Sequence, residues 1–191
     1  RGGWSAGSDG YKRRRLDSGA NCDARHDLGD PDGAGRSAVY WAARGGHLST
    51  FRLLKSKGAD VRAAANNGVT PFMTTCGKGG SLQIARELKD AGADPNATTN
   101  DGFNAVHLAA ENGHLDVLRS LVRWRWRSGQ HRQRIDLNAT TNRGYTAVHI
   151  ASQFGHLDIL RALQGWNVDL NATTNDGLNA VHLAAQYDHL D

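Results

Sequence analysis

Histidine is the residue type in this chain that most readily suggests chemistry. Nine histidines occur among 191 residues, and imidazole can bind metal ions or transfer protons near neutral pH. Seven of them recur at two fixed positions, one after Ala-Val and the other before leucine: His107, His149 and His182, and His47, His114, His156 and His189. Because a metal site needs several ligands that converge, one histidine per recurring segment predicts a structural role.

Other candidates for metal or phosphate chemistry are weak. Cys22 and His26 are four residues apart, but no second ligand pair follows them, so we expect no zinc site. The segment Gly77-Lys78-Gly79-Gly80-Ser81 lacks the earlier glycine and the hydroxyl after lysine that a phosphate-binding loop requires. No nucleophile lies beside a base, and we therefore expect neither catalysis nor a cofactor.

One basic, aromatic segment breaks the pattern of the chain. Residues 123–134 hold five arginines and no acid, which gives this segment a charge of +5. Because the whole chain has a net charge of +4, the remaining residues together carry −1. The inserted residues of interest are Arg125, Trp126, Arg127, Arg132 and Arg134. One interpretation is a basic finger that binds an acidic partner or, as a weaker alternative, nucleic acid. The other is a lengthened helix with a solvated loop tip, where an insertion costs little.

An internal repeat determines the expected fold. Asn100-Asp101-Gly102-Phe103-Asn104-Ala105-Val106-His107 recurs from Asn142 and again from Asn175. Gly144 and Gly177 are 33 residues apart, whereas Gly102 and Gly144 are 42 apart, which leaves an insertion of nine. A period near 33 predicts a solenoid of small, stacked units.

Each unit is expected to contain two short helices. Val106, Ala109 and Ala110 share one face of the first helix, and Leu115, Leu118 and Leu121 form the apolar stripe of the second. Asn104, Thr146 and Asn179 are placed to cap first helices. Gly58 and Gly92 are expected to end second helices in the left-handed conformation, with Asn167 as the substitute in the fourth unit.

These segments resemble the ankyrin repeat. The resemblance covers about residues 35–191 and implies an all-α solenoid of helix-loop-helix units joined by hairpin-like turns. It also implies that the first histidine position bonds between adjacent turns and that the second helps to start the second helix. The proline of the family pattern is kept only at Pro71, and the second unit has one extra residue between its helices, so it should be the least regular.

The domain organisation follows from the repeat. Residues 1–34 are interpreted as a degenerate partial repeat and an irregular Gly/Asp-rich linker. Residues 35–191 form the array, with about four full or nearly full units, a truncated last unit and an insertion near 125–133. We expect the chain to be a fragment of a longer array.

The resemblance places partner recognition on the hairpin tips and the ends of the first helices, where the repeat varies. The polar Asn100, Asn142 and Asn175 belong to these tips. The candidate partner-binding residues are Asp101, Phe103, Glu111, Asn112, Arg143, Tyr145, Gln153, Phe154, Asp176, Leu178, Gln186 and Tyr187. For Phe103, Tyr145 and Leu178 the alternative is that they pack along the hairpin row.

The hairpin asparagines are also candidates for modification. Asn96, Asn138 and Asn171 each begin Asn-Ala-Thr, a glycosylation sequon that we attribute to copying of the hairpin. The family resemblance implies a different modification, hydroxylation by a cytosolic asparaginyl hydroxylase. Asn96 and Asn171 are the candidates, because Leu88 and Leu163 precede them by eight residues.

The predicted function is therefore a non-catalytic scaffold that binds a protein partner, acting as a monomer without membrane contact. The alternatives are polyanion binding through the insert and a regulatory arm of an enzyme that lies outside this segment. Two cysteines and no visible secretory signal favour the cytoplasm. Lys12-Arg13-Arg14-Arg15 is either a nuclear import signal or one face of a helix.

Overall fold

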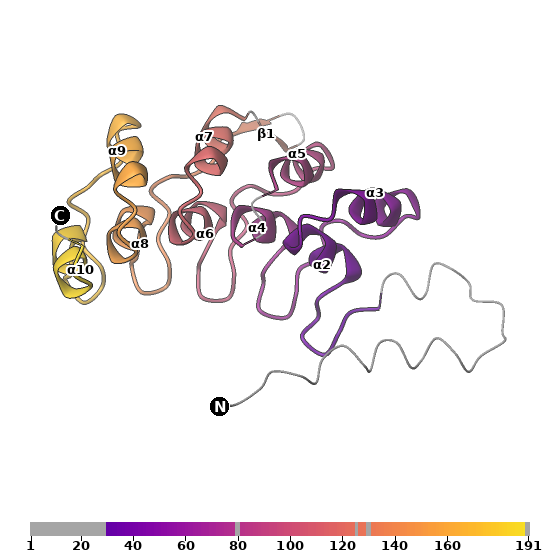
Figure 1. Cartoon of the computed structure of the whole chain (residues 1–191), viewed down its shortest axis with the longest axis horizontal. Helices are drawn as coiled ribbons and strands as arrows, with labels where there is room; N and C mark the ends of the chain where they lie inside the picture. Colours follow the sequence, from indigo (N-terminus) through magenta and orange to yellow (C-terminus); the bar gives the residue numbers. More distant parts are fainter. Residues whose placement is uncertain (1–29, 79–80, 125, 129–130, 190–191) are drawn as a thin grey trace.

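The computed structural model describes residues 30–78, 81–124, 126–128 and 131–189, with no description of the side chains of 126–128 and 131–133. Helices in this part of the chain form two rows (Figure 1). The first helices of the units are α2 (Ala38–Arg44), α4 (Pro71–Cys76), α6 (Ala105–Glu111), α8 (Ala147–Gln153) and α10 (Ala180–Gln186). The second helices are α3 (Leu48–Ser56), α5 (Leu82–Asp90), α7 (Leu115–Arg123) and α9 (Leu157–Gly165).

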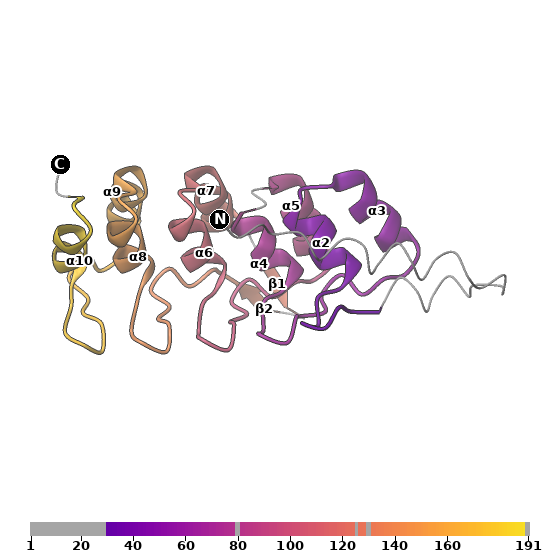
Figure 2. The same ribbon diagram turned by 60° about the horizontal axis from the view of Figure 1, so that its bottom comes forward.

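Successive units stack side by side. Each first helix packs on the next, from α2 through α4, α6 and α8 to α10, while each second helix packs on its own first helix. Long turns project from one side of the first-helix row in both views (Figures 1 and 2). In Figure 1 the row forms a shallow arch whose inner side faces these turns. The predicted all-α repeat fold is confirmed.

The core runs continuously between the two rows. Leu118 and Leu121 of α7 are fully buried, as are Ala109 and Ala110 of α6, where the small side chains allow close helix contact. Val106 and Val148 lie at the same position of successive units, and each is 1% exposed. Each unit thus covers the apolar face of its neighbour, as expected for a solenoid.

The ends of the helices follow the sequence signals. Pro71 begins α4, where its missing N–H costs nothing, and Gly58 and Gly92 have φ angles of 82° and 81° after α3 and α5. Asn167 takes the same left-handed conformation, with φ 61°, so its predicted role as a substitute for glycine is confirmed. The second unit differs in spacing: α4 and α5 start 11 residues apart, whereas α6 and α7 start 10 apart.

The insertion forms a small β-ribbon. Strand β1 (Trp126–Ser128) pairs antiparallel with β2 (His131–Gln133), and Arg127 lies opposite Arg132 in the register. Helix α7 ends at Arg123, so the interpretation of the insertion as a lengthened helix is wrong. The ribbon is a local addition to the helical array.

The cap of α6 leads to a stability prediction. The Asn104 side-chain oxygen accepts hydrogen bonds from the N–H groups of Val106 and His107, but its buried Nδ2 has no partner among the described residues. Hydroxyl residues occupy the same position before α2, α4 and α8. We expect Asn104→Thr to raise the free energy of unfolding by about 1 kcal/mol, since a buried unpaired donor costs about that much or more.

Urea denaturation measures this gain. Asn179→Thr is the matched control, because Asn179 caps α10 in the same way but is only half-buried. Its unfolding free energy should change little. A loss of stability in Asn104→Thr, or an equal change in both variants, contradicts the role assigned to the unpaired amide.

Candidate partner-binding surface

A ladder of asparagines links the hairpin turns. The backbone N–H of Asn142 donates to the carbonyl of Asp101 at 3.0 Å, and its side-chain amide donates to the carbonyl of Asn100 at 2.9 Å. Asn100 and Asn175 make the equivalent pair of bonds to the hairpin that precedes each of them. These three asparagines thus have a structural role, since their side-chain donors bond between units.

Glycine is required where these asparagines approach. Gly102 has φ 83°, and a Cβ added there would lie 2.8 Å from both the backbone nitrogen and the side-chain oxygen of Asn142. Gly144 stands in the same relation to Asn175, at 2.8 Å and 2.5 Å. The close spacing of the hairpins therefore depends on the absence of a side chain at the repeat glycine.

Buried histidines form a second set of bonds between units. His107 Nδ1 accepts the N–H of Asn104 at 3.1 Å, so the ring proton lies on Nε2, which donates to the Ala139 carbonyl at 3.0 Å. His149 repeats this arrangement with Thr146 and with the carbonyl of Leu178 at 3.2 Å. The bonding role that the resemblance implied for the first histidine position is therefore present in the structure.

These bonds predict a pH dependence of stability. Burial lowers the pKa of His107 and His149, although hydrogen bonds to backbone carbonyls oppose the shift. The folded chain then binds fewer protons than the unfolded chain, in which histidine titrates near about 6.5. We expect the two neutral histidines to contribute fully to the free energy of unfolding above that pH. This contribution should be lost progressively as the pH falls towards their lowered pKa values. Urea midpoints should be lower at pH 5.5 than at pH 7.5; an equal or higher midpoint at pH 5.5 contradicts this.

The second histidine position has a role that the resemblance did not imply. His114 and His156 precede α7 and α9, but their side chains make no cap hydrogen bond. His156 Nε2 instead lies 3.2 Å from the carbonyl of Glu111 in the preceding unit, against Gly113. This histidine therefore joins units and does not start its helix through a side-chain cap.

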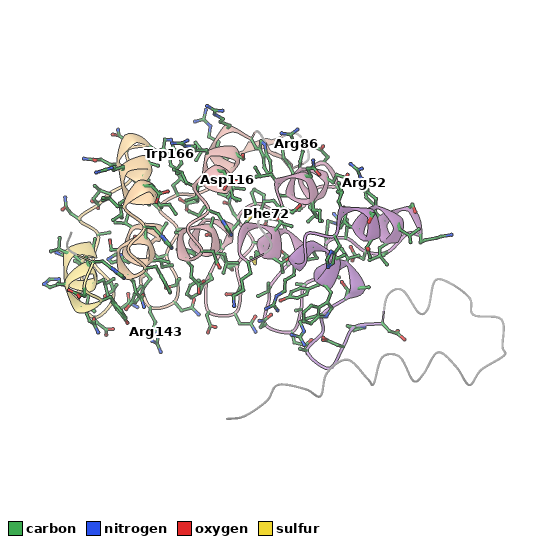
Figure 3. The ribbon with its side chains drawn as sticks, in the orientation of Figure 1. Arg52, Phe72, Arg86, Asp116, Arg143 and Trp166 are labelled. Carbon is green, nitrogen blue, oxygen red and sulfur yellow. The ribbon has the colours of Figure 1, made fainter. Side chains whose placement is uncertain are left out.

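The hairpin tips expose charges of alternating sign. Asp101, Arg143 and Asp176 occupy the same position of successive hairpins, and all three are exposed. Arg143 lies at the outer end of its turn, away from the helices (Figure 3). Because the ladder fixes the distance between hairpins, it also fixes the spacing of these charges.

The apolar residues of the hairpins are less exposed than residues that serve recognition alone would be. Phe103, Tyr145 and Leu178 are half-buried. The Phe103 ring lies 5.7 Å from the His107 ring in an edge arrangement, and Tyr145 lies 5.8 Å from His149. These contacts favour the alternative of packing along the hairpin row for the two aromatic residues, which still leave one part of each ring accessible.

Residues at the end of the first helices vary in exposure. Phe154 and Tyr187 are each 45% exposed, and Phe154 stacks on the His156 ring with an interplanar angle of 12°. Gln186 is exposed, whereas Glu111, Asn112 and Gln153 are half-buried. Asn112 donates its side-chain amide to the Leu108 carbonyl at 2.8 Å. The aromatic residues therefore provide most of the accessible apolar area in this set.

The first unit adds a cluster that the sequence analysis missed. Trp41 of α2 is 42% exposed, with the guanidinium groups of Arg36 and Arg44 at 4.5 Å and 5.3 Å from its ring centre. Its indole N–H donates to Asp32, which also forms an ion pair with Arg36 at 2.8 Å. Trp41 occupies the position of Leu108 and Ile150 in later units. Aligning the first unit with the others would have identified it.

The insertion is fixed at its base by Asn96. The Asn96 side chain donates to the carbonyl of Arg134 at 3.0 Å and accepts the N–H of Asp136 at 2.9 Å. Arg134 is exposed. Arg125 lies outside the described residues, as do the side chains of Trp126, Arg127 and Arg132, so the basic finger stays a prediction.

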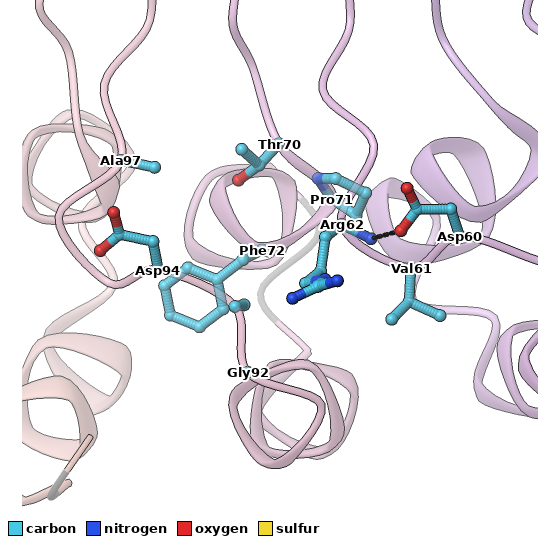
Figure 4. Close-up of a pocket in the computed structure, with 10 residues that line it drawn as sticks. Asp60, Val61, Arg62, Thr70, Pro71, Phe72, Gly92, Asp94 and Ala97 are labelled. Atoms are coloured by element: carbon cyan, nitrogen blue, oxygen red, sulfur yellow. Dashed lines mark hydrogen bonds between the residues drawn. The ribbon is translucent and has the colours of Figure 1, made fainter. Parts of the chain in front are cut away.

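A hollow with a volume of about 460 Å³ lies between two hairpins (Figure 4). Asp60, Arg62 and Asp94 are among the residues that line it, and the Thr70 hydroxyl already caps α4 by accepting the Met73 N–H. No nucleophile beside a base lines this space.

Other reactive groups are equally constrained. Complete burial raises the pKa of the Cys76 thiol to about 12, so it stays protonated and unreactive at neutral pH. Among the described residues, no three His, Cys, Asp or Glu side chains gather as metal ligands. Cys22 and His26 lie outside the described residues, as does the basic segment Lys12–Arg15.

Comparison with known proteins identifies the family. The family model described as "Ankyrin repeats (3 copies)" matches overlapping segments at residues 14–99, 40–129, 75–174 and 130–191. A comparison with curated proteins found no matching relative. No helix in the described ranges is long and apolar enough to cross a membrane. The stacked helix pairs, the hairpin ladder and these matches show that the chain belongs to the ankyrin repeat family.

Proposed function

We propose that the chain is a non-catalytic scaffold that binds a protein partner through its hairpin tips and the accessible ends of its first helices. Ankyrin repeats generally mediate protein–protein interaction and are typically without catalytic activity. The observation that carries the proposal is the exposure of Trp41, Phe154 and Tyr187 along the row of first helices, at 42%, 45% and 45%.

These aromatic residues suit a binding surface. Trp and Tyr contribute large contact areas at a small entropic cost and are enriched among residues that dominate binding energy. Asp101, Arg143 and Asp176 would then select a partner whose charges alternate in the opposite order. Rigid spacing lowers the cost of binding, because the surface is ordered before the partner arrives.

The double substitution Trp41→Ala with Phe154→Ala tests the proposal by quantitative affinity capture. Loss of two aromatic anchors should reduce the recovered partner at least about tenfold. Leu53→Ala is the matched control, because Leu53 is 59% exposed but lies on the second helix α3. An unchanged set and amount of partners in the double variant contradicts the placement of the surface.

We also propose that Asn171, and not Asn96, accepts hydroxylation. Asn171 is exposed, and the bond described for it is donated by its backbone N–H to Asp169. The Asn96 amide, by contrast, already bonds at both of its polar atoms to the base of the insertion. Peptide mass analysis of the native protein should find an added oxygen on Asn171; no added oxygen there, or one on Asn96 instead, contradicts the proposal.

A further inference from the structure

A basic groove runs between α7 and α9, on the row of second helices. It has a volume of about 260 Å³ and is lined by Arg119, Val122 and Arg123 from α7 and by Ala162, Gly165 and Trp166 from the end of α9. Both arginines are exposed, and Trp166, which is labelled beside α9 in Figure 3, is half-buried. The lining therefore combines two positive charges with an apolar floor and contains no carboxylate.

The corresponding contact between α3 and α5 shows what such a groove can hold. There, Glu87 of α5 lies 2.6 Å from Arg52 Nε and 3.4 Å from Lys55 Nζ of α3. These bonds lower the pKa of the Glu87 carboxyl, the Arg52 bond most of all. The chain thus binds one carboxylate between two cations of the neighbouring second helix.

The register of the helices matches the two places at two of their three charged positions. All four second helices have nine residues and begin with leucine. Arg52 and Arg119 are each the fifth residue of their helix, whereas Glu87 and Ala162 are each the sixth. The groove between α7 and α9 therefore keeps the arginine but has a methyl group where the carboxylate would be. Val122 takes the position of Lys55, and the second cation, Arg123, is one residue further along the helix.

The two arginines of the groove have no carboxylate partner in the part of the chain that the structure describes. The acids on the same helices, Asp116 and Asp158, lie in the first turns, at the end opposite to Arg123 and Trp166. A ligand with one compact acidic group fits this distribution better than an extended polyanion, which Asp116 and Asp158 would repel.

We propose that this groove binds an acidic peptide segment of a partner protein. A glutamate or aspartate carboxylate would bind Arg119 as Glu87 binds Arg52, with Arg123 as the second cation, and an adjacent apolar side chain would contact Val122 and Trp166. Arginine binds carboxylates through paired, charge-assisted hydrogen bonds, which gives this contact both energy and direction. The site is separate from the hairpin tips and so does not depend on the surface proposed above.

The probe is the peptide acetyl-Gly-Ser-Glu-Leu-Ser-Gly-amide, which carries one carboxylate followed by one leucine, titrated into the whole isotope-labelled chain and followed by NMR. We expect saturable shifts of the Trp166 indole N–H and of the Arg119 and Arg123 Nε–H signals. Arg119→Gln with Arg123→Gln should weaken binding at least about tenfold, because charged hydrogen bonds are removed. Arg86→Gln, which removes an exposed charge of α5 outside the groove, should leave the affinity unchanged.

The sharpest variant places the carboxylate inside the chain. Ala162→Glu should form the equivalent of the Glu87 contact with Arg119 and weaken binding at least about tenfold, whereas Ala162→Gln adds similar bulk without charge and should weaken it less. Glu87→Ala should release Arg52 and Lys55 and add a second set of shifts in α3 and α5.

Three results overturn the proposal. The first is an absence of shifts at the groove with the peptide, and the second is binding that is equally strong in Ala162→Glu. The third is tighter binding of a single-stranded oligonucleotide at the same arginines, which identifies the groove as a nucleic-acid site. Trp41→Ala with Phe154→Ala should not alter the peptide affinity, so a failure here is distinguishable from a failure of the proposed function.

Discussion

Replacing Gly102 with alanine is expected to lower the free energy of unfolding by about 3 kcal/mol. An L-residue in the left-handed conformation costs about 1–2 kcal/mol, and the new methyl group would lie 2.8 Å from the backbone nitrogen of Asn142. Overpacking of this kind adds about 1–3 kcal/mol, because the obstacle includes backbone that cannot rotate away. The hairpins on either side would have to separate, which breaks the ladder at that point.

Gly177→Ala is the matched control for this prediction. Gly177 occupies the same place in its hairpin, with φ 76°, but nothing lies within 4 Å of an added Cβ. It should cost only the conformational part, about 1–2 kcal/mol. Urea denaturation of both variants separates the two contributions, and equal losses would show that the approach of Asn142 does not constrain the array.

Replacing His107 with leucine is expected to cost about 3 kcal/mol. The leucine side chain cannot accept the N–H of Asn104 or donate to the carbonyl of Ala139, and each backbone group is then left without its present partner. An unpaired buried polar group costs about 1–3 kcal/mol. The loss should appear in urea denaturation at pH 7.5, where the histidine is neutral.

The same substitution in α10 provides the comparison. His182 accepts the N–H of Asn179 at 3.2 Å but is exposed, so water can replace that bond. His182→Leu should therefore change the unfolding free energy by less than about 1 kcal/mol. A cost in His182→Leu that matches the cost in His107→Leu would contradict the importance of the bond between units.

The regular part of the fold was predictable because the same glycine, capping and apolar positions recur in each unit. The recurring glycine indicates the spacing, and the position of Asn167 at the end of its second helix predicts the left-handed conformation that it adopts. Such signals are local, since each depends on residues within one hairpin or one helix. Each signal recurs in several units, so the helices of any one unit can be assigned by aligning it with the others.

Contacts between units were harder to predict, because a linear sequence does not show which side chain reaches a neighbour. Asn142 was interpreted as a variable surface residue, although its recurrence with Asn100 and Asn175 was a signal for the ladder. His156 stands at the N-cap of α9 as expected, but its side chain reaches back to Glu111, which the sequence did not show. The β-ribbon also escaped prediction, because arginine and glutamine favour helices as much as short strands.

The candidate surface shows the same division. Differences among the repeats of this chain predicted that Phe154 and Tyr187, each at the end of a first helix, are exposed, and both are. They could not show that Tyr145 packs against a buried histidine ring. Trp41 was overlooked because the first unit departs from the repeat in its hairpin, where Asp32 and Arg36 hold the tryptophan in place.

The central claim is that the row of first helices, with its hairpins, selects the protein partner. Site-specific photo-crosslinking tests it most directly, with a photoreactive residue placed at position 154 in one variant and at position 53 in another. Both positions are exposed, at 45% and 59%, but only Phe154 belongs to the first-helix row. We predict that captured partner crosslinks from position 154 and not from position 53, whereas crosslinking from position 53 alone would contradict the account.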